Sequence, residues 1–314
     1  MRFTLVRNLI FIFLGLVLFF FSCRKDEIAS EPATLYSGLD TNLYPGNFSD
    51  YSPPEFQENN NTQRNLLIEE FTGHYCGVCP RAHEKSAELK SAYPNRVFVA
   101  SIHAGPDWDG VTVLQTANET GSFTRDFTTN EGKELAATFN NIQPSFTGNP
   151  QGSVSRIVGD DKFITGYSEW QAHVIANLDS PLQVNLQAKS DYYPETKGLY
   201  LHVETEFLTE LTSQYKLVGY VIEKEIIDWQ RDYLYSPASD LEFYQHKDIH
   251  IGNVTGETWG TLYSSEEKTT GVKSIDRYSY TVPNHLEPTD FHILFFVYDI
   301  YTYEIFQVIH HEIE

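Results

Sequence analysis

The chain has 314 residues, which is long for one ordinary domain and points to about two. With 41% hydrophobic and 14% aromatic residues, its composition is that of a folded protein and argues against global disorder. The formal net charge of −21 argues against nucleic acid as a partner, because so acidic a surface repels phosphate. It also repels anionic lipid, so any membrane attachment needs a covalent or hydrophobic anchor.

Residues 1–22 have the pattern of a signal peptide. Arg2 and Arg7 give a positively charged start, and an apolar run from Leu9 to Phe21 follows. That run is shorter than the roughly 20 residues that a transmembrane helix needs, and it fits the apolar region of a signal peptide. We therefore leave residues 1–22 out of the expected fold.

The apolar run ends at Ser22-Cys23, which resembles a lipoprotein signal-peptidase site. In that family of signals the cysteine becomes the new N-terminus and is acylated, and several acyl chains give a lasting anchor. The alternative is an ordinary secretory signal with an incidental cysteine. The following residues 24–27 (RKDE) resemble the export signal of surface lipoproteins in some Gram-negative bacteria. We expect a protein anchored in the outer membrane through lipid on Cys23, facing either the periplasm or the cell exterior.

Residues 23–62 are expected to form the lipidated N-terminus and a tether. The stretch 28–62 contains four prolines and the run Asn59-Asn60-Asn61, and it shows no sustained periodicity. Such a composition favours a spacer between the membrane and a folded domain. The sequence leaves open that the stretch packs as an extended arm.

The first folded domain is expected over residues 63–180, and its start has a strand–helix–strand pattern. A strand is predicted over 65–71, a helix from Cys76 or Gly77 to Tyr93, and a second strand over 96–102. Pro80 is tolerable in the first helical turn, whereas Pro94 stops the helix. This order predicts parallel pairing of the two strands.

Cys76 and Cys79 stand where the first strand passes into the helix. Unpaired N–H groups and the positive end of the helix dipole favour a thiolate there. Cys79 follows one turn later, within disulfide reach. Cys76 would attack a substrate, and Cys79 would resolve the mixed disulfide.

The segment from Glu69 to Pro80 (EEFTGHYCGVCP) resembles the active-site segment of thioredoxin-like proteins. It is more similar still to the outer membrane protein 28-related lipoprotein family, whose members carry a similar EEFTG stretch before the CxxC, and the resemblance covers residues 65–314. The thioredoxin resemblance implies that Glu70 is a buried proton acceptor for Cys79. A strand-end carboxylate facing water is the alternative. It also implies a cis-proline opposite the cysteines, for which Pro150 is the first choice and Pro144 the second.

Other interpretations of the cysteine pair remain. Pro80, rather than His, follows the second cysteine, which argues against a c-type haem. His74 and His83 could complete a Cys₂His₂ zinc site, and a static disulfide without turnover is a further alternative. His103, after the second strand, could touch a substrate or be an ordinary loop residue. We expect no metal and no cofactor.

The composition changes near residues 179–181, and strand signals repeat from there to the end. They lie at 182–188, 199–208, 215–223, 277–282, 292–299 and 303–310. Such a series predicts an antiparallel β-sandwich over 181–314. The expected fold is therefore an α/β thioredoxin-like domain followed by an all-β antiparallel sandwich domain. His246 and His250 would suit a metal only on a helix, and their surroundings are those of a loop or strand, so we read them as structural.

Two functions are compatible with these features. The first is thiol–disulfide exchange with exported proteins at the cell envelope, with Cys76, Cys79, Glu70 and Pro150 as the site residues. The second is a non-enzymatic surface lipoprotein that binds a protein or glycan, with the thioredoxin-like domain as its scaffold. A Cys76 that is buried beneath the second domain would favour the second function.

Overall fold

The computed structural model describes residues 37–235 and 239–313. Its α-helices are α2 (Cys79–Ala92), α3 (Asn130–Ile142) and α4 (Trp170–Asn177). Its short 3-10 helices are η1 (Thr41–Leu43), η2 (Phe48–Asp50) and η3 (Pro288–Asp290). Its strands are β1 (Leu66–Thr72), β2 (Val97–His103), β3 (Gln151–Val154), β4 (Val184–Tyr193), β5 (Gly198–Phe207), β6 (Tyr215–Arg231), β7 (Asp240–Asn253), β8 (Thr261–Leu262), β9 (Lys273–Thr281), β10 (Phe291–Asp299) and β11 (Ile305–Glu312).

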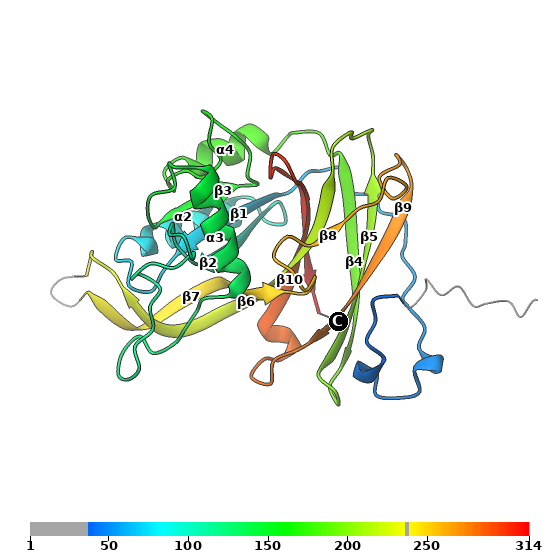
Figure 1. Ribbon diagram of the computed structural model, residues 1–314, viewed down its shortest axis with the longest axis horizontal. Coiled ribbons are helices and arrows are strands. Elements are labelled where there is room, and N and C mark those ends of the chain that lie inside the picture. Colours follow the sequence, from blue (N-terminus) through cyan, green and yellow to red (C-terminus); the bar gives the residue numbers. More distant parts are fainter. Residues whose placement is uncertain (1–36, 236–238, 314) are drawn as a thin grey trace, which may run out of the picture. The chain divides into compact units, whose positions relative to one another are not determined.

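Eight of these strands form one mixed sheet. Its order is β11-β10-β6-β7-β2-β1-β3, and β8 pairs with β6 (Figure 1). β1 and β2 are parallel, as the sequence predicts, with Leu66 opposite Val97, and β3 lies antiparallel to β1. The connection from β1 to β2 runs through α2, so the cysteine pair lies near the start of a crossover helix, a thioredoxin-like pattern.

Helices cover both faces of this part of the sheet. Alternate residues of β1 point to opposite faces. Leu66 and Ile68 pack with residues of α2 and α4, whereas Leu67 and Phe71 pack with residues of α3. Consecutive side chains of β1, including the two glutamates Glu69 and Glu70, therefore enter different cores.

The large sheet contains strands from both halves of the chain. β2 meets β7 in parallel, with Ser101 opposite Ile249, so the sheet continues across the boundary that the composition change near residue 180 marks. β6 and β7 form a long hairpin, and neither β7 nor the part of β6 beyond Glu223 is among the strands expected from the sequence.

A smaller antiparallel sheet has the order β4-β5-β9. It packs against the β6–β10 part of the large sheet, since Val184, Leu201 and Val203 share a core with Leu217 and Phe295. The strands expected in this region form, with ends displaced by a few residues. The antiparallel layer that the sequence predicts is thus a three-stranded sheet facing a mixed sheet.

The N-terminal arm, residues 38–65, packs along the small sheet and leads into β1 (Figure 1). Tyr51 is 5% exposed, and its hydroxyl lies 2.8 Å from Asp191 Oδ2 and 2.7 Å from His202 Nε2. The Asn59 side chain donates to the Leu186 carbonyl oxygen. The described part of the expected tether is therefore an extended arm, the alternative that the sequence leaves open.

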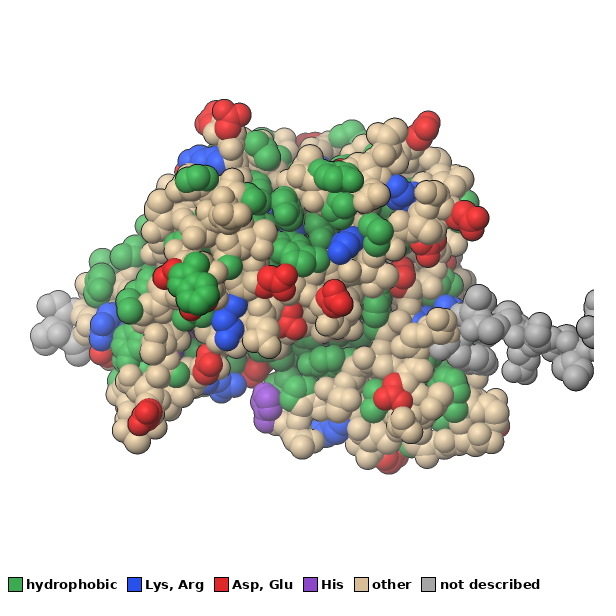
Figure 2. Space-filling view, in the orientation of Figure 1, with side chains coloured by type: hydrophobic (Ala, Val, Ile, Leu, Met, Phe, Trp, Pro, Cys, Tyr) green, Lys and Arg blue, Asp and Glu red, His purple; other side chains and the backbone are tan. Residues whose placement is uncertain are grey.

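The expected signal peptide, residues 1–22, and the expected lipidation site, Cys23, lie outside the described residues. Within the described ranges, no helix is both long and apolar enough to cross a membrane. Figure 2 shows acidic side chains dispersed over one face of the molecule and hydrophobic side chains exposed among them.

Candidate functional site

Cys76 and Cys79 form a disulfide next to the C-terminal end of β1. Cys79 is the first residue of α2, so the helix begins later than the expected Cys76 or Gly77, and Cys76 belongs to the preceding turn. In that turn the Cys79 N–H donates to the Cys76 carbonyl oxygen. The exposed fractions of Cys76 and Cys79 are only 3% and 0%.

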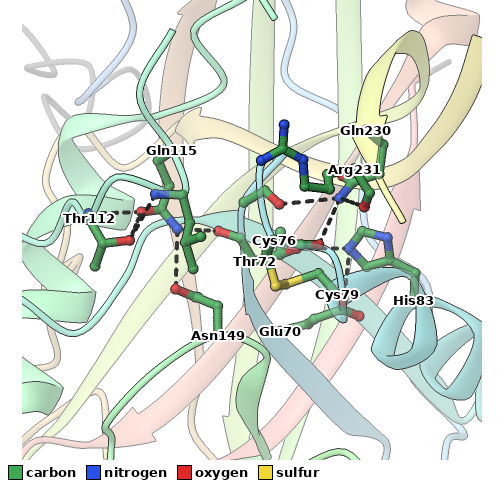
Figure 3. Close-up of a disulfide and its surroundings, with 12 residues drawn as sticks. Glu70, Thr72, Cys76, Cys79, His83, Thr112, Gln115, Asn149, Gln230 and Arg231 are labelled. Carbon is green, nitrogen blue, oxygen red and sulfur yellow. Dashed lines mark hydrogen bonds and ion pairs between the residues drawn. A yellow bond between two sulfur atoms is a disulfide. The ribbon is translucent and has the colours of Figure 1, made fainter. Parts of the chain in front are cut away.

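The Asn149–Pro150 peptide bond is cis and precedes β3. Asn149 lies on the opposite side of the disulfide from His83 (Figure 3). Its side-chain amide donates to the Ala104 carbonyl oxygen at 2.9 Å. The Gln115 side-chain amide donates to the carbonyl oxygens of Thr72 and Ala104, and so ties the ends of β1 and β2 together beside this loop. Pro150, the expected cis-proline, thus sits in a loop anchored next to the cysteines.

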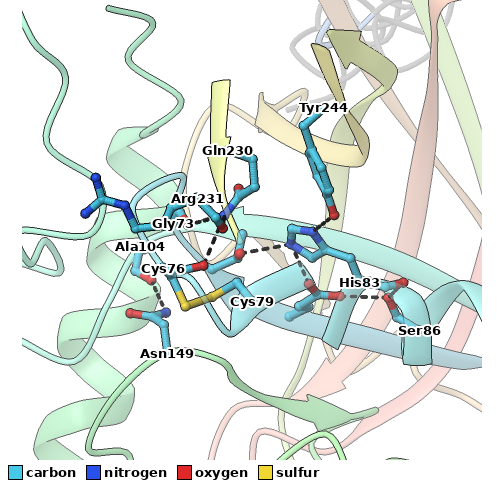
Figure 4. A network of polar contacts seen from close by, with 12 residues as sticks. Gly73, Cys76, Cys79, His83, Ser86, Ala104, Asn149, Gln230, Arg231 and Tyr244 are labelled. Atoms are coloured by element: carbon cyan, nitrogen blue, oxygen red, sulfur yellow. Dashed lines mark hydrogen bonds and ion pairs between the residues drawn. A yellow bond between two sulfur atoms is a disulfide. The ribbon is translucent and has the colours of Figure 1, made fainter. Parts of the chain in front are cut away.

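Glu70 is fully buried rather than facing water. Cys79, His83 and Ser86 occupy positions i, i+4 and i+7 of α2 and so share one helix face. Ser86 Oγ donates to Glu70 Oε2 at 2.7 Å, and His83 Nε2 lies 2.8 Å from Glu70 Oε1 (Figure 4). The helix face that carries Cys79 therefore also holds the Glu70 carboxyl, which lies beside Cys79 in Figure 3.

The tip of the β6–β7 hairpin covers the cysteine loop. The N–H groups of Arg231 and Tyr233 donate to the carbonyl oxygens of His74 and Gly77 at 2.8 and 2.9 Å. The Gln230 side-chain amide donates to the Cys76 carbonyl oxygen at 3.0 Å. The Tyr233 ring lies against Gly77 so closely that a Cβ there would come within 2.5 Å of it. These hairpin contacts account for the burial of Cys76. They could not be predicted from the sequence around the cysteines, because the hairpin lies more than 150 residues further along the chain.

Ion pairing fastens the hairpin to the helix. Arg81, in the first turn of α2, lies 2.6 Å from Asp232 Oδ2, and the Asp232 side chain is only 2% exposed. Arg231 and Asp240 pair across the base of the tip. The hairpin is therefore bound to the cysteine loop by backbone, side-chain and ionic contacts together.

Buried histidines lie behind the cysteine loop. His103, at the end of β2, stacks on Phe127, and both its ring nitrogens lack a hydrogen-bond partner among the described residues. Burial lowers the pKa of His103 well below its usual value and that of His246 to about 3. His250 contacts Thr129 and Asn253. These side chains are neutral packing groups at neutral pH.

The expected alternatives for the cysteine pair can be compared with these contacts. His74 Nε2 contacts the Thr116 carbonyl oxygen, and His83 contacts Glu70 and Tyr244, so neither imidazole turns to the cysteines. Among the residues that the structure describes, no three or more His, Cys, Asp and Glu side chains are grouped to hold a metal ion.

A second carboxylate network, not predicted from the sequence, lies on the other face of β1. The neighbouring Glu69 accepts two hydrogen bonds from the Arg156 guanidinium at 2.7 and 2.6 Å and one from the Tyr220 hydroxyl at 2.9 Å. Burial alone would raise the pKa of Glu69, but the charge and hydrogen bonds of Arg156 outweigh it and lower that pKa. Tyr220 belongs to β6, so this network ties the two halves of the chain together. The alternation of β1 places Glu69 in a core, but nothing in the sequence pairs it with Arg156.

A strand, a crossover helix and a parallel strand, with a cysteine pair at the start of the helix, define a protein with a thioredoxin-like pattern. The family model described as outer membrane protein Omp28 matches residues 137–314, more than half of the chain. The chain belongs to this family. The resemblance stated from the sequence and the expected outer-membrane location are thereby confirmed, and the family implies a lipid anchor.

Some solved structures are similar to this chain at low sequence identity. The chain resembles HBP35 of Porphyromonas gingivalis with a TM-score of 0.56 and 15% identity, over 81% of this chain and 76% of that one. It also matches a domain of the outer membrane lipoprotein Omp28 of the same organism, with 20% identity over 42% of this chain and 88% of that one and a TM-score of 0.28. A protein of Agrobacterium tumefaciens matches with 12% identity over 78% and 93% and a TM-score of 0.47. No curated protein matches.

Proposed function

We propose that the chain is a lipid-anchored envelope protein that exchanges thiols and disulfides with exported proteins through Cys76 and Cys79. The observation that carries this proposal is the placement of the disulfide. It lies at the start of α2, between a loop with a cis-proline and a buried carboxyl that is held by His83 and Ser86. These are the parts that a two-cysteine exchange reaction uses.

In the reduced protein, the Cys76 thiolate would attack a substrate disulfide, form a mixed disulfide and release one substrate thiolate. Cys79 would then lose its proton to Glu70, and its thiolate would attack Cys76 Sγ. The Cys76–Cys79 bond forms, and the second substrate thiolate leaves with the electron pair of the broken bond. The protein is thereby oxidised by two electrons and the substrate reduced by two. The reverse sequence oxidises a substrate dithiol. Pro150 would support the docked substrate chain.

Anchoring is the second part of the proposal. Cys23 would carry the lipid, and the membrane would be the partner at that end. The thioredoxin-like region, 63–180, would carry the exchange chemistry, and the β-sandwich region, 181–314, would present the hairpin that covers it. The oxidising envelope would supply substrates among exported proteins.

One observation favours the second candidate function, a binding lipoprotein with a static disulfide. Both cysteines are almost wholly buried, and the hairpin lies over the one that would attack. A nucleophilic thiol needs access to its substrate. Exchange therefore requires the hairpin tip to move away from Cys76, whereas a binding protein would keep it in place.

The test is a redox titration of the mature lipoprotein in detergent. The protein is equilibrated in glutathione buffers and alkylated, and modified Cys76 and Cys79 are quantified by mass spectrometry. A reversible two-electron transition between roughly −270 and −120 mV, lost in Cys76→Ser, supports exchange and tells reductant from oxidant. A disulfide that resists reduction at about −300 mV, or a dithiol that never closes, favours the binding function.

A further inference from the structure

Glu70 has no direct route to water. Its side chain is fully buried, with Ser86 on one carboxyl oxygen and His83 on the other (Figure 4). A carboxyl that takes a proton from Cys79 must give it up again, either back to Cys79 or to solvent. Release to solvent needs a path out of the interior.

Among the described residues, His83 is the contact of Glu70 that leads outward. Its Nε2 shares a hydrogen bond with Thr72 Oγ1 at 2.9 Å, and it lies 2.8 Å from Glu70 Oε1, a buried oxygen that has no hydrogen bond among the described residues. Its Nδ1 lies 2.7 Å from the hydroxyl oxygen of Tyr244, on β7. The two ring nitrogens thus face an interior acid and a more exposed hydroxyl, and an imidazole can take a proton at one nitrogen while it releases one at the other.

The far end of this path meets an open groove of about 540 Å³ between α2 and β7. Both His83 and Tyr244 line the groove, together with Ser86, Lys90, Phe243 and Asp248. The Glu70 side chain is fully buried, whereas that of His83 is 15% exposed and Tyr244 is also partly exposed. The path therefore runs from the buried site to solvent.

We propose that His83 and Tyr244 relay protons between Glu70 and the groove, and so reset the buried carboxyl after each transfer from Cys79. This inference rests on the proposed exchange function and assigns a role to two residues of the same site. His83 and Tyr244 act through Glu70, so they are positioning and proton-transfer residues.

The relay balances in protons. Glu70 takes the Cys79 proton and passes it from Oε1 to His83 Nε2, while the proton on Nδ1 moves to the Tyr244 oxygen. The hydroxyl proton of Tyr244 leaves for water in the groove, which restores the negative charge of Glu70. The reverse sequence returns a proton from the groove to Glu70 and restores the first imidazole tautomer. Burial raises the pKa of the Tyr244 hydroxyl, so it stays protonated at neutral pH and works by exchange.

Charged groups in and beside the groove would set the pH dependence of the relay. Lys90 and Asp248 form an ion pair in it at 2.7 Å, and Glu84 and Lys247 also line it. Glu70 is the charged group at the inner end. The relay is therefore judged by the difference between the pH profiles of wild type and variant.

The experiment separates the two chemical steps in the mature lipoprotein in detergent. Reduced protein is mixed with a chromogenic aromatic disulfide in a stopped-flow instrument, and the first and second released thiolates are timed between pH 5 and 9. In His83→Gln the first release should keep its rate. The second release needs deprotonated Cys79, and without the relay the proton stays on Glu70 and can return to Cys79 before its thiolate attacks. This release should therefore slow about tenfold or more and recover with added imidazole. His285→Gln, at an exposed histidine, is the matched control and should behave as wild type.

Tyr244→Phe provides the second variant, in case His83→Gln does not fold. It removes one oxygen at the groove and should slow the second release about threefold or more, against no change in the control Tyr301→Phe, at an exposed tyrosine outside the site. Wild-type second-step rates in a folded His83→Gln, or in Tyr244→Phe, would overturn the relay while exchange itself stands. A wild-type protein that releases no second thiolate overturns the exchange function and the relay with it.

Discussion

Glu69 and Glu70 are neighbours on one strand, yet they sit in two different chemical settings. Glu69 is bound by the Arg156 guanidinium and the Tyr220 hydroxyl, and neither gives up its proton near neutral pH. Glu70 is bound by Ser86 and by an imidazole, whose protonation can change. The same side chain is therefore a fixed cross-link at one position and an exchangeable acid at the next, and the partners decide which.

Glu69→Gln should have the largest effect on folding. It leaves the Arg156 cation buried without its counter-charge, so we expect the free energy of unfolding to fall by about 3–5 kcal/mol. Denaturant unfolding with the disulfide intact measures this. The double variant Glu69→Gln/Arg156→Met should regain part of the loss because no buried charge remains unpaired. A loss below about 1 kcal/mol would contradict the cross-link role.

A change of pH separates Glu69 from the buried histidines. Burial lowers the pKa of His246 to about 3 and that of His292 to about 2, whereas both imidazoles protonate near 6.5 in the unfolded chain. Their contribution to stability is complete above pH 6.5 and is lost as the pH falls. We expect about 2 kcal/mol of loss from each between pH 7 and 5.

Glu69 keeps its charge in this range, because its pKa is lowered and its contribution is lost only at lower pH, as the pH falls through its folded pKa. Unfolding measured at pH 7 and at pH 5 gives the slope. The slope of the unfolding free energy against pH measures how many more protons the unfolded chain binds than the folded one. His246→Gln and His292→Gln should each lower that number by about one. Equal stability at the two pH values would show that these imidazoles are not held neutral.

Tyr233→Ala tests whether the β6–β7 hairpin shields Cys76 from reagents. Removal of the ring that lies against Gly77 should raise the rate at which reduced Cys76 is alkylated by about tenfold. That factor corresponds to about 1.4 kcal/mol less free energy needed to expose the thiol. Mass spectrometry of trapped Cys76 measures that rate. Leu234→Ala, at an exposed neighbour, is the control. An unchanged rate would mean that the backbone contacts of the hairpin alone close the site.

Glu70→Gln should have the smallest effect on stability. The amide keeps the shape of the carboxyl and its contact with Ser86, so we expect the free energy of unfolding to fall by about 1 kcal/mol or less. Parallel denaturation of Glu69→Gln and Glu70→Gln gives a direct ranking. If the two losses were equal, the contrast between the neighbouring carboxyls would fail.

Local patterns in the sequence predict the strand–helix–strand unit well. Pro94 ends the first helix near where expected, β1 and β2 pair in parallel, and the strands from β4 to β6 and from β9 to β11 form near their expected places. These features depend on periodicity and on proline, which act over a few residues.

Long-range pairing could not be predicted in the same way. β7 escaped detection because its polar sequence lacks a simple alternation, and positive φ values at Asp248 and Gly252 interrupt it. Its contact between Ser101 and Ile249 and the partnership of Glu69 with Arg156 join residues far apart in the chain. At the candidate site, the spacing of Cys79, His83 and Ser86 was the one signal for the Glu70 contacts, and it becomes visible only once Glu70 is known to face α2.

The packed N-terminal arm limits how far this protein can act from its membrane. If lipid is carried on Cys23, about 15 residues separate it from Gly38, the first residue of the packed arm, and a chain of that length spans at most about 50 Å. A free tether through residue 62 would have allowed more than twice that distance. Any partner must therefore come within about 50 Å of the bilayer plus the width of the folded region.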